Sequence, residues 1–247
     1  MKKTVIIVIA IVAVVAAVST IVALRGWPGG LVGSGNLETE TYAFSDFTQV
    51  EIGSAFEFEI EQSSSYGINI TADDNVMEYI QVSKDGRTLK IGLRTGLGIF
   101  PGPVSATLRA SVTMPQLRGL TASGASHGTV SGFSSSEDLD VTVSGASRVS
   151  GDITAGDVQF GISGASTIQL EGSASDIDAN VSGASHLSLD DFLVNDVDVN
   201  FSGASSGTVN LNGRLDANLS GASTLWYIGE PTSTDINTSG ASTVTRK

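Results

Sequence analysis

The sequence predicts an all-β protein whose larger part is a parallel β-helix, and three observations lead to this prediction. The four-residue word Ser-Gly-Ala-Ser occurs seven times at intervals near 19 residues, and repeats of about this period are typical of solenoids with one coil per repeat. Glycine is abundant, at 29 of 247 residues, whereas only 6% of residues are aromatic and 16% are charged. Apolar and polar residues alternate with a period of two, as in half-buried strands.

Composition also excludes several classes of function. The net charge of -13 argues against a nucleic-acid partner, because phosphates attract basic surfaces. The chain has no cysteine, which excludes thiol catalysis, disulfides and thiolate metal sites, and two histidines are too few for a multi-histidine metal site. Residues 119–247 hold 15 acidic and 4 basic side chains, so most of the negative charge lies on the predicted solenoid.

The first segment is expected to address the chain to a membrane. Lys2 and Lys3 precede 21 uncharged residues, 4–24, with no glycine or proline. As a helix they would span about 31 Å, close to the ~30 Å thickness of a hydrocarbon core. We expect residues 1–25 to form an uncleaved transmembrane anchor with the rest of the chain outside the cytoplasm; the alternative is a cleaved signal sequence and a secreted protein. Residues 26–38 are expected to form a flexible linker.

Residues 39–119 predict an irregular, strand-rich part of the domain. The run Phe56–Glu61 alternates apolar with acidic residues, as a strand with one wet face does. Asp85-Gly86 indicates a hairpin, since the primed turns of hairpins need positive φ. Residues 96–103 are expected to form a loop, and a single helical turn is expected near residues 73–79.

Residues 120–247 predict a β-helix of seven repeats, right-handed because parallel crossovers almost always are. The glycine of each word is expected to make a corner, because glycine adopts positive φ without a Cβ penalty. The alanine after it is expected to fit the crowded inside of the bend. Further turns are expected at Gly132, Gly151, Gly172 and Gly213. The words begin at Ser123, Ser144, Ser163, Ser182, Ser202, Ser220 and Ser239, and their corner glycines are Gly124, Gly145, Gly164, Gly183, Gly203, Gly221 and Gly240.

A second short strand is expected after each word, and one apolar residue of that strand should point inward. The expected inward residues are Val130, Val149, Ile168, Leu187, Val209, Leu225 and Val244.

The strand before each word carries an outward acidic position. Stacked like charges destabilise a sheet unless they are solvated or bridged. A solvated acidic face is one interpretation; a Ca²⁺ ion bridging neighbouring coils is the other, since calcium prefers carboxylate and carbonyl oxygens. Gln159 interrupts the column, which begins at Asp140. The metal-ligand candidates are Asp178, Asp198, Asp216 and Asp235.

Other candidate chemistry favours structural roles. His127 and His186 each follow a word directly and so share one column, but three coils, about 14 Å, separate them, which is too far to share a metal. No base repeats beside the serines that begin the words, so their hydroxyls are expected to satisfy backbone groups at the corners rather than to act as nucleophiles.

Together, the apolar N-terminal segment, the strand-rich opening from Phe47-Thr48-Gln49-Val50 to Leu93 and the repeated Ser-Gly-Ala-Ser coils resemble the GIN domain. This family carries the description "putative auto-transporter adhesin, head GIN domain" and is a domain of unknown function. The resemblance covers residues 40–247 and implies a β-helical fold at the cell surface. Only residues 243–247 follow the seventh word in this sequence, so we do not expect the translocating barrel of an autotransporter within it.

Three functional hypotheses follow. The leading one is a membrane-tethered, non-enzymatic adhesion module that presents a rigid acidic face to carbohydrate, a cell-wall polymer or a surface protein, with no cofactor. A second is an envelope assembly or sensory partner that pairs through the exposed end of the β-helix. A third is a polysaccharide lyase or hydrolase, which β-helices also support. Against the third, an enzyme site should break the repeat, whereas the acidic residues follow it and Arg148 and Arg214 are isolated.

Overall fold

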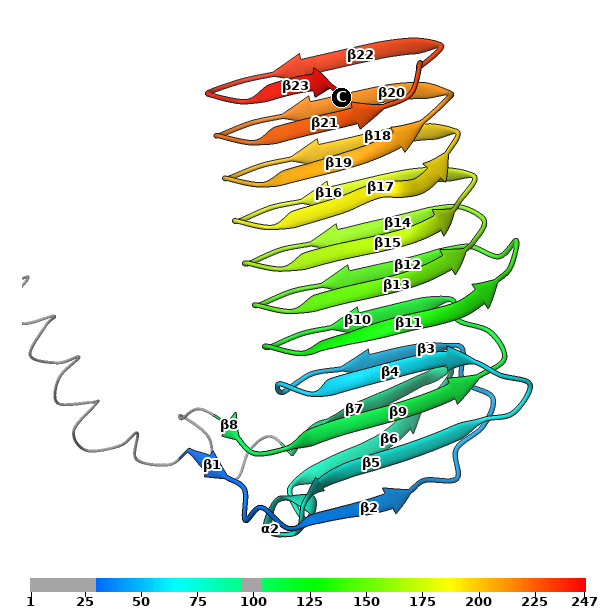
Figure 1. Cartoon of the computed structure of the whole chain (residues 1–247), viewed down its shortest axis with the longest axis vertical. Coiled ribbons are helices and arrows are strands. Elements are labelled where there is room, and N and C mark those ends of the chain that lie inside the picture. The colour runs from blue at the N-terminus through cyan, green and yellow to red at the C-terminus, as the bar shows by residue number, and fades with distance from the viewer. Residues whose placement is uncertain (1–29, 95–103) are drawn as a thin grey trace, which may run out of the picture.

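The computed structural model describes residues 30–94 and 104–247 and shows a stack of flattened coils, each with one strand on either side (Figure 1). Strands on one side form a ten-stranded sheet, sheet I, and those on the other an eleven-stranded sheet, sheet II. Inward side chains of both sheets meet in one continuous apolar core. The prediction of an all-β parallel solenoid is confirmed; its right-handed coiling stays a prediction.

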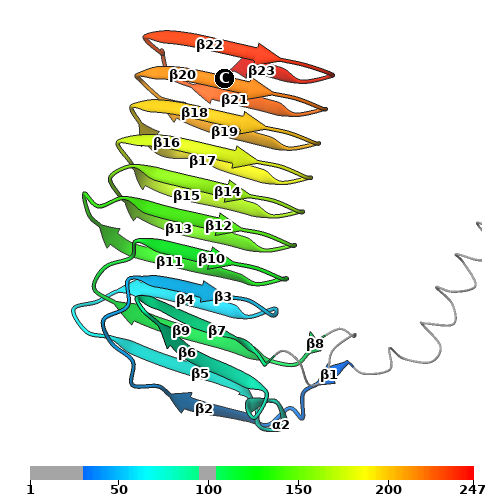
Figure 2. The same ribbon diagram turned by 180° about the vertical axis from the view of Figure 1, so that it is seen from behind.

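The seven repeats each contribute one strand to each sheet, joined by the Ser-Gly-Ala-Ser corner (Figure 2). All neighbouring repeat strands pair in parallel. Sheet I contains β10 (Gly119–Ala122), β12 (Leu139–Val143), β14 (Val158–Ile162), β16 (Asp176–Val181), β18 (Asp196–Phe201), β20 (Arg214–Leu219) and β22 (Ser233–Thr238). Sheet II contains β11 (His127–Ser134), β13 (Arg148–Thr154), β15 (Thr167–Ser173), β17 (His186–Val194), β19 (Ser206–Leu211), β21 (Thr224–Ile228) and β23 (Thr243–Arg246).

The corner glycines all have positive φ, between 69° and 81°. A Cβ on Gly183 would also lie 2.4 Å from the carbonyl oxygen of Gly164 in the coil before it. That oxygen accepts a hydrogen bond from the Ala184 amide at 2.8 Å, so the ladder between coils continues through the corner. Glycine is therefore required both by the backbone conformation and by the close approach of the next coil.

The small residue inside each bend is a serine, so the prediction for alanine is wrong. Ala125 and its equivalents are exposed, whereas the last serine of each of the first six words is at most 1% exposed. Ser126 Oγ donates to the Ser123 carbonyl oxygen at 2.9 Å, and Ser223 makes the same bond to Ser220. A buried hydroxyl can thus satisfy a corner carbonyl from within, which alanine cannot.

Three of the four further glycine turns predicted from the sequence need correction, whereas Gly213 lies between β19 and β20 as predicted. Gly151 and Gly172 lie inside strands β13 and β15, and Gly132 inside β11, so these residues with positive φ bend strands rather than form turns. In β19, Gly207 rather than Val209 is in register with Leu187. Likewise Gly128, not Val130, pairs with Val149.

Phenylalanines fill the space that these two inward glycines leave. A Cβ on Gly128 would lie 2.5 Å from the Phe58 ring, and one on Gly207 would lie 2.8 Å from the Phe201 ring. The prediction that Val130 and Val209 point inward is confirmed, since both are buried, although they lie in the next inward column.

The solenoid extends into the segment that the sequence analysis treated as irregular. Strands β3 (Gln49–Ile52) and β4 (Glu57–Gln62) stack in parallel on β10 and β11. Their corner, Gly53-Ser54-Ala55-Phe56, lacks the repeated word, and Ser54 and Ala55 adopt φ of 63° and 65°. Below them, β7 (Thr88–Leu93) and β9 (Leu108–Met114) stack in parallel on β3 and β4. Coil order therefore departs from chain order here.

Antiparallel strands close the N-terminal end of the stack (Figure 1). Strand β6 (Ile80–Asp85) pairs with β7 through the predicted hairpin, while β5 (Gly67–Asp73) pairs with β9 and β2 (Leu37–Thr41) with β5. The predicted helical turn is α2 (Asp74–Met77). The predicted loop at 96–103 overlaps the undescribed residues 95–103.

Part of the predicted linker 26–38 packs against this end. Strand β1 (Leu31–Val32) pairs with β8 (Val104–Ser105), and β2 begins at Leu37. The buried carboxylate of Asp73 accepts hydrogen bonds from the amides of Gly35 and Thr107, both at 2.7 Å. Ordered pairing therefore starts before residue 39. The predicted anchor, 1–25, lies outside the described residues, and no helix among the described ones is long and apolar enough to cross a membrane.

Candidate functional site

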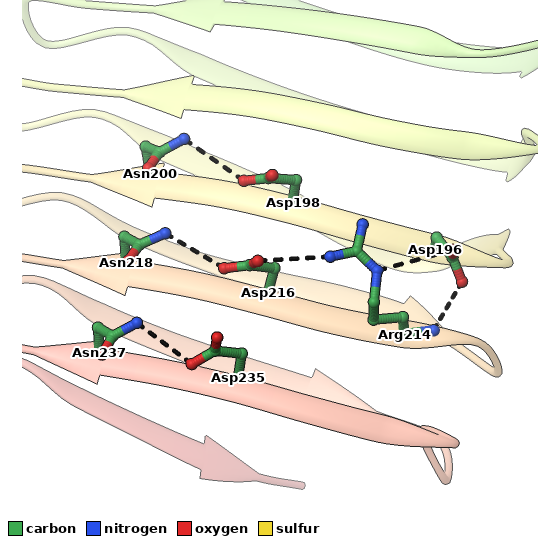
Figure 3. A network of polar contacts seen from close by, with 8 residues as sticks. All are labelled: Asp196, Asp198, Asn200, Arg214, Asp216, Asn218, Asp235 and Asn237. Atoms are coloured by element: carbon green, nitrogen blue, oxygen red, sulfur yellow. Dashed lines mark hydrogen bonds and ion pairs between the residues drawn. The ribbon is translucent and has the colours of Figure 1, made fainter.

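The predicted acidic column forms one face of sheet I, together with a column of asparagines two residues further along each strand (Figure 3). Parallel pairing aligns like residues of successive coils, so each carboxylate and each amide repeats at about 4.8 Å. We call this surface the Asp/Asn face. It consists of Asp178, Asp198, Asp216 and Asp235 with Asn180, Asn200, Asn218 and Asn237.

Within each strand of the Asp/Asn face, the asparagine donates to the aspartate. The Nδ2 atom of Asn218 lies 3.2 Å from Oδ1 of Asp216, and the same bond in the other three strands measures 3.1–3.5 Å. This bond fixes the amide orientation and leaves the amide oxygen and the second N–H of each asparagine for a ligand.

The negative charge of the face is partly compensated by Arg214. Arg214 Nη1 lies 3.4 Å from Asp216 Oδ2, and its Nε lies 3.9 Å from Asp196 Oδ2. The pKa of Asp198 is raised, first because burial removes water from its carboxylate and then because Asp216 and Asp178 repel its charge; Arg214 opposes the shift. Asp198, which lies between two other carboxylates, therefore bears the repulsion within this column.

The geometry does not assemble a cation site. Among the residues that the structure describes, no group of three or more His, Asp or Glu side chains is placed to hold a metal ion. The carboxylates instead form a single file, one per coil, each engaged by its neighbouring amide. Calcium binding by these aspartates stays a prediction from the sequence.

A shallow groove of about 530 Å³ runs beside the Asp/Asn face, parallel to the solenoid axis. One wall is the asparagine column and the other is the first serine of four successive words. The backbone of Phe201 and Leu219, whose side chains are buried in the core, forms the floor. The serines are Ser182, Ser202, Ser220 and Ser239. Repeated amides opposite repeated hydroxyls offer alternating donors and acceptors to a ligand that lies along the axis.

Register confirms the placement of the two histidines. His127 and His186 lie in one column of sheet II with Arg148 and Thr167 between them, three coil steps apart. His186 Nδ1 is 2.9 Å from Ser206 Oγ.

Sheet II also carries an outward aromatic residue that was not predicted from the sequence. Trp226 lies on β21, and the Nζ atom of Lys247 lies 5.9 Å from its ring centroid. That ammonium also donates to Asp190 at 2.6 Å and Thr208 at 3.1 Å. The signal was present, because Trp226 follows the inward Leu225 and must therefore point outward.

A parallel solenoid with a repeated polar face belongs to the class of elongated repeat proteins that present long binding surfaces. The family model described as "Putative auto-transporter adhesin, head GIN domain" matches residues 46–231, and the chain belongs to this family. No curated protein matches the chain.

Several solved structures share the fold. A putative adhesin from Bacteroides fragilis has a TM-score of 0.80 at 21% identity, covering 88% of this chain and 100% of that one. A putative adhesin from Parabacteroides merdae has a TM-score of 0.64 at 20% identity, with 89% and 99% covered. A putative lipid binding protein from Parabacteroides distasonis has a TM-score of 0.68 at 20% identity, with 88% and 99% covered. At these identities the likeness shows the fold alone.

Proposed function

We propose that this protein is a non-enzymatic adhesion module, tethered to the cell membrane through residues 4–24, that binds a neutral carbohydrate polymer along the Asp/Asn face. The observation that carries the proposal is the axial groove, whose asparagine and serine walls repeat once per coil over four coils. Three steps of about 4.8 Å give the ladder a length of roughly 14 Å. Many weak polar contacts at one spacing suit a regular, hydroxyl-rich polymer.

Charge decides which polymer fits this groove. The four stacked carboxylates beside the groove repel an anionic chain, whereas a neutral sugar can form hydrogen bonds to the asparagine amides and serine hydroxyls that line it. The family description and the adhesin names of the solved relatives support an adhesion-type role. They describe no enzyme, and the acidic residues of the face repeat with the coil instead of forming a single unusual cluster.

A glycan and cell-wall fragment array tests this proposal with the full chain in detergent micelles. We expect binding to neutral polysaccharides, and we expect the double variant Asn200→Ala/Asn218→Ala to weaken it at least tenfold. Thr142→Ala is the matched control, because Thr142 occupies the same column two coils before Asn180 and lies outside the groove.

Two outcomes would contradict the proposal. Equal binding by the double variant and the wild type would show that the groove is not the site. Release of shortened sugars from a bound polymer would favour the polysaccharide-degrading alternative instead.

A further inference from the structure

A second groove lies on the outer surface of sheet II, near the N-terminal end of the stack, and its chemistry differs from that of the first. It has a volume of about 600 Å³ and crosses five neighbouring strands: β5, β9, β4, β11 and β13. Two columns of outward side chains form its walls, and the backbone at Ala110, Phe58 and Gly128 lies between them. Like the first groove, it runs across the strands, parallel to the solenoid axis.

One wall of this groove carries its basic side chains. Register places Arg109, Glu57, His127 and Arg148 side by side in that order, one per strand. Arg109 Nε is 2.9 Å from Glu57 Oε2, so these two charges compensate each other. Arg148 has no carboxylate within ion-pair distance among the described residues. Elsewhere in residues 119–247, Arg214, Arg246 and Lys247 each pair with a carboxylate.

Among the described basic residues of the acidic stretch 119–247, Arg148 is thus the unpaired one. Its planar fork can bind a carboxylate through two parallel N–H···O bonds. His127, on the next strand, has Nδ1 3.3 Å from the Ala125 carbonyl oxygen, to which it can only donate. Nε2 of His127 is therefore the ring nitrogen left to accept a hydrogen from a ligand hydroxyl.

The opposite wall is lined mainly by neutral groups. Ser111, Thr129 and Ser150 present hydroxyls from three strands, and Asn69 presents an amide. Glu59 is the acidic residue of this wall; it lies on β4, two strands away from Ser150 on β13. A carboxylate on the ligand is thus favoured at the β13 end of the groove, beside Arg148 and away from Glu59.

We propose that this groove binds a uronate-containing polysaccharide, with a sugar carboxylate on Arg148 and ring hydroxyls shared between His127 and the hydroxyl wall. A uronic acid carries its carboxylate and its hydroxyls on one ring, which matches a groove with one basic and one hydroxyl-lined wall. This site is independent of the neutral-polymer groove on sheet I, whose carboxylates would repel the same ligand.

Calorimetric titration of the full chain in detergent micelles with tetragalacturonate tests this inference, with neutral maltotetraose as the comparison sugar. We expect tetragalacturonate to bind and to lose affinity as salt rises, since an exposed charge pair is screened. Arg148→Gln should weaken binding tenfold or more, and Arg148→Lys should weaken it less, because lysine keeps the charge but loses the fork. Arg214→Gln, the same change on sheet I, should leave the affinity unchanged.

The two proposals fail separately. The double variant Asn200→Ala/Asn218→Ala tests the first groove. It should lose neutral-glycan binding and keep the wild-type affinity for tetragalacturonate. The inference is overturned if wild-type protein does not bind tetragalacturonate at millimolar concentration. It is equally overturned if Arg148→Gln, with an unchanged melting temperature, binds it as tightly as the wild type does.

Discussion

Each corner of the solenoid depends on the glycine and on the last serine of the repeated word, which have different structural roles. The glycine lets the chain turn with positive φ. It also leaves room for the previous coil: a Cβ on Gly183 would lie 2.4 Å from the Gly164 carbonyl oxygen. The buried serine supplies a hydroxyl to the inside of the turn. Where the serine donates to a backbone carbonyl it adds a hydrogen bond; where it has no partner it carries a desolvation cost.

The corner glycine should tolerate alanine much less well than a glycine that only turns the chain. Gly183→Ala is expected to lower the free energy of unfolding by roughly 2–5 kcal/mol, because a left-handed conformation costs about 1–2 kcal/mol and overpacking about 1–3 kcal/mol. Gly86→Ala is the control: its φ is 58°, but nothing lies within 4 Å of its Cβ position, so about 1–2 kcal/mol is expected. Chemical denaturation measures both, and equal losses would disprove the clash between coils.

The buried serines should divide into two groups when they are replaced by alanine. Ser166 Oγ has no hydrogen-bond partner among the described residues, whereas Ser223 Oγ donates to the Ser220 carbonyl at 2.9 Å. Ser166→Ala is therefore expected to leave stability unchanged or raise it, and Ser223→Ala to lower it by about 1 kcal/mol. Thermal melts of the two variants decide this, and a clear loss for Ser166→Ala would mean that its hydroxyl is satisfied.

At the scale of the strands, parallel register turns a sequence repeat into columns of identical side chains. This favours hydrogen-bonded columns such as the asparagines, but it also stacks like charges. Asp198 lies between Asp178 and Asp216, and their repulsion adds to its desolvation in raising its pKa. Asp190 on sheet II shows the opposite, because its hydrogen bond from Lys247 lowers its pKa.

These opposite shifts predict opposite pH dependences. A raised pKa means that folded Asp198 holds its proton more tightly than the unfolded chain does. Its contribution to stability therefore falls as pH rises from the ordinary value of 3.8 through the raised pKa. Asp198→Asn should stabilise the protein at pH 7 and lose this advantage below pH 3.8.

Asp190→Asn should behave in the reverse sense. The stability that Asp190 contributes is present above the ordinary value of 3.8 and is lost as pH falls through its lowered pKa. The variant should be less stable than the wild type at pH 7, with the difference shrinking in acid. Unfolding curves between pH 3 and 7 provide the test for both aspartates, and a difference of the same sign in the two variants would contradict the charge assignment.

The sequence predicts those elements that its repeat and alternation encode locally. Seven identical words reveal seven coils, and Asp85-Gly86 reveals the β6–β7 hairpin. The β3–β4 coil could not be predicted from the repeat, because its corner is Gly53-Ser54-Ala55-Phe56 instead of the repeated word. In this corner the residues with positive φ are not glycines. The stacking of β7 and β9 beneath that coil could not be predicted either. These strands are neighbours of β3 and β4 out of chain order, and no local sequence pattern indicates such a neighbour.

Part of each candidate site could be predicted from the sequence, because the repeat places equivalent residues of successive coils in one column. The acidic column follows directly from the repeat. The first residue after each word also forms a column, so His127 and Arg148 could have been recognised as neighbours from the alignment. The pairing of Arg109 with Glu57, which leaves Arg148 as the available cation, depends on the out-of-order stacking of β9 against β4.

At the scale of the whole molecule, the solenoid carries two axial grooves on opposite sheets, displaced along its length. The groove beside the Asp/Asn face spans β16 to β22, and the second groove, which contains Arg148, spans β5 to β13. Because each coil contacts mainly its neighbours, a change in one groove is expected to leave the other intact. This modularity is what allows the two binding proposals to be tested by separate variants of one protein.

The proposal that the first 25 residues hold this molecule in the membrane gives the last prediction. The uncharged run 4–24 is long enough to cross a membrane, and Lys2 and Lys3 before it favour a cytoplasmic N-terminus. The full-length chain should therefore sediment with membranes, and protease added to intact cells or to spheroplasts should degrade the GIN domain. Val14→Arg puts a charge at the centre of the run, at a cost of about 2.5–3.5 kcal/mol, and should reduce the membrane-bound fraction, whereas Val14→Leu should not. A shortened protein in the soluble extracellular fraction would instead show that the segment is a cleaved signal sequence.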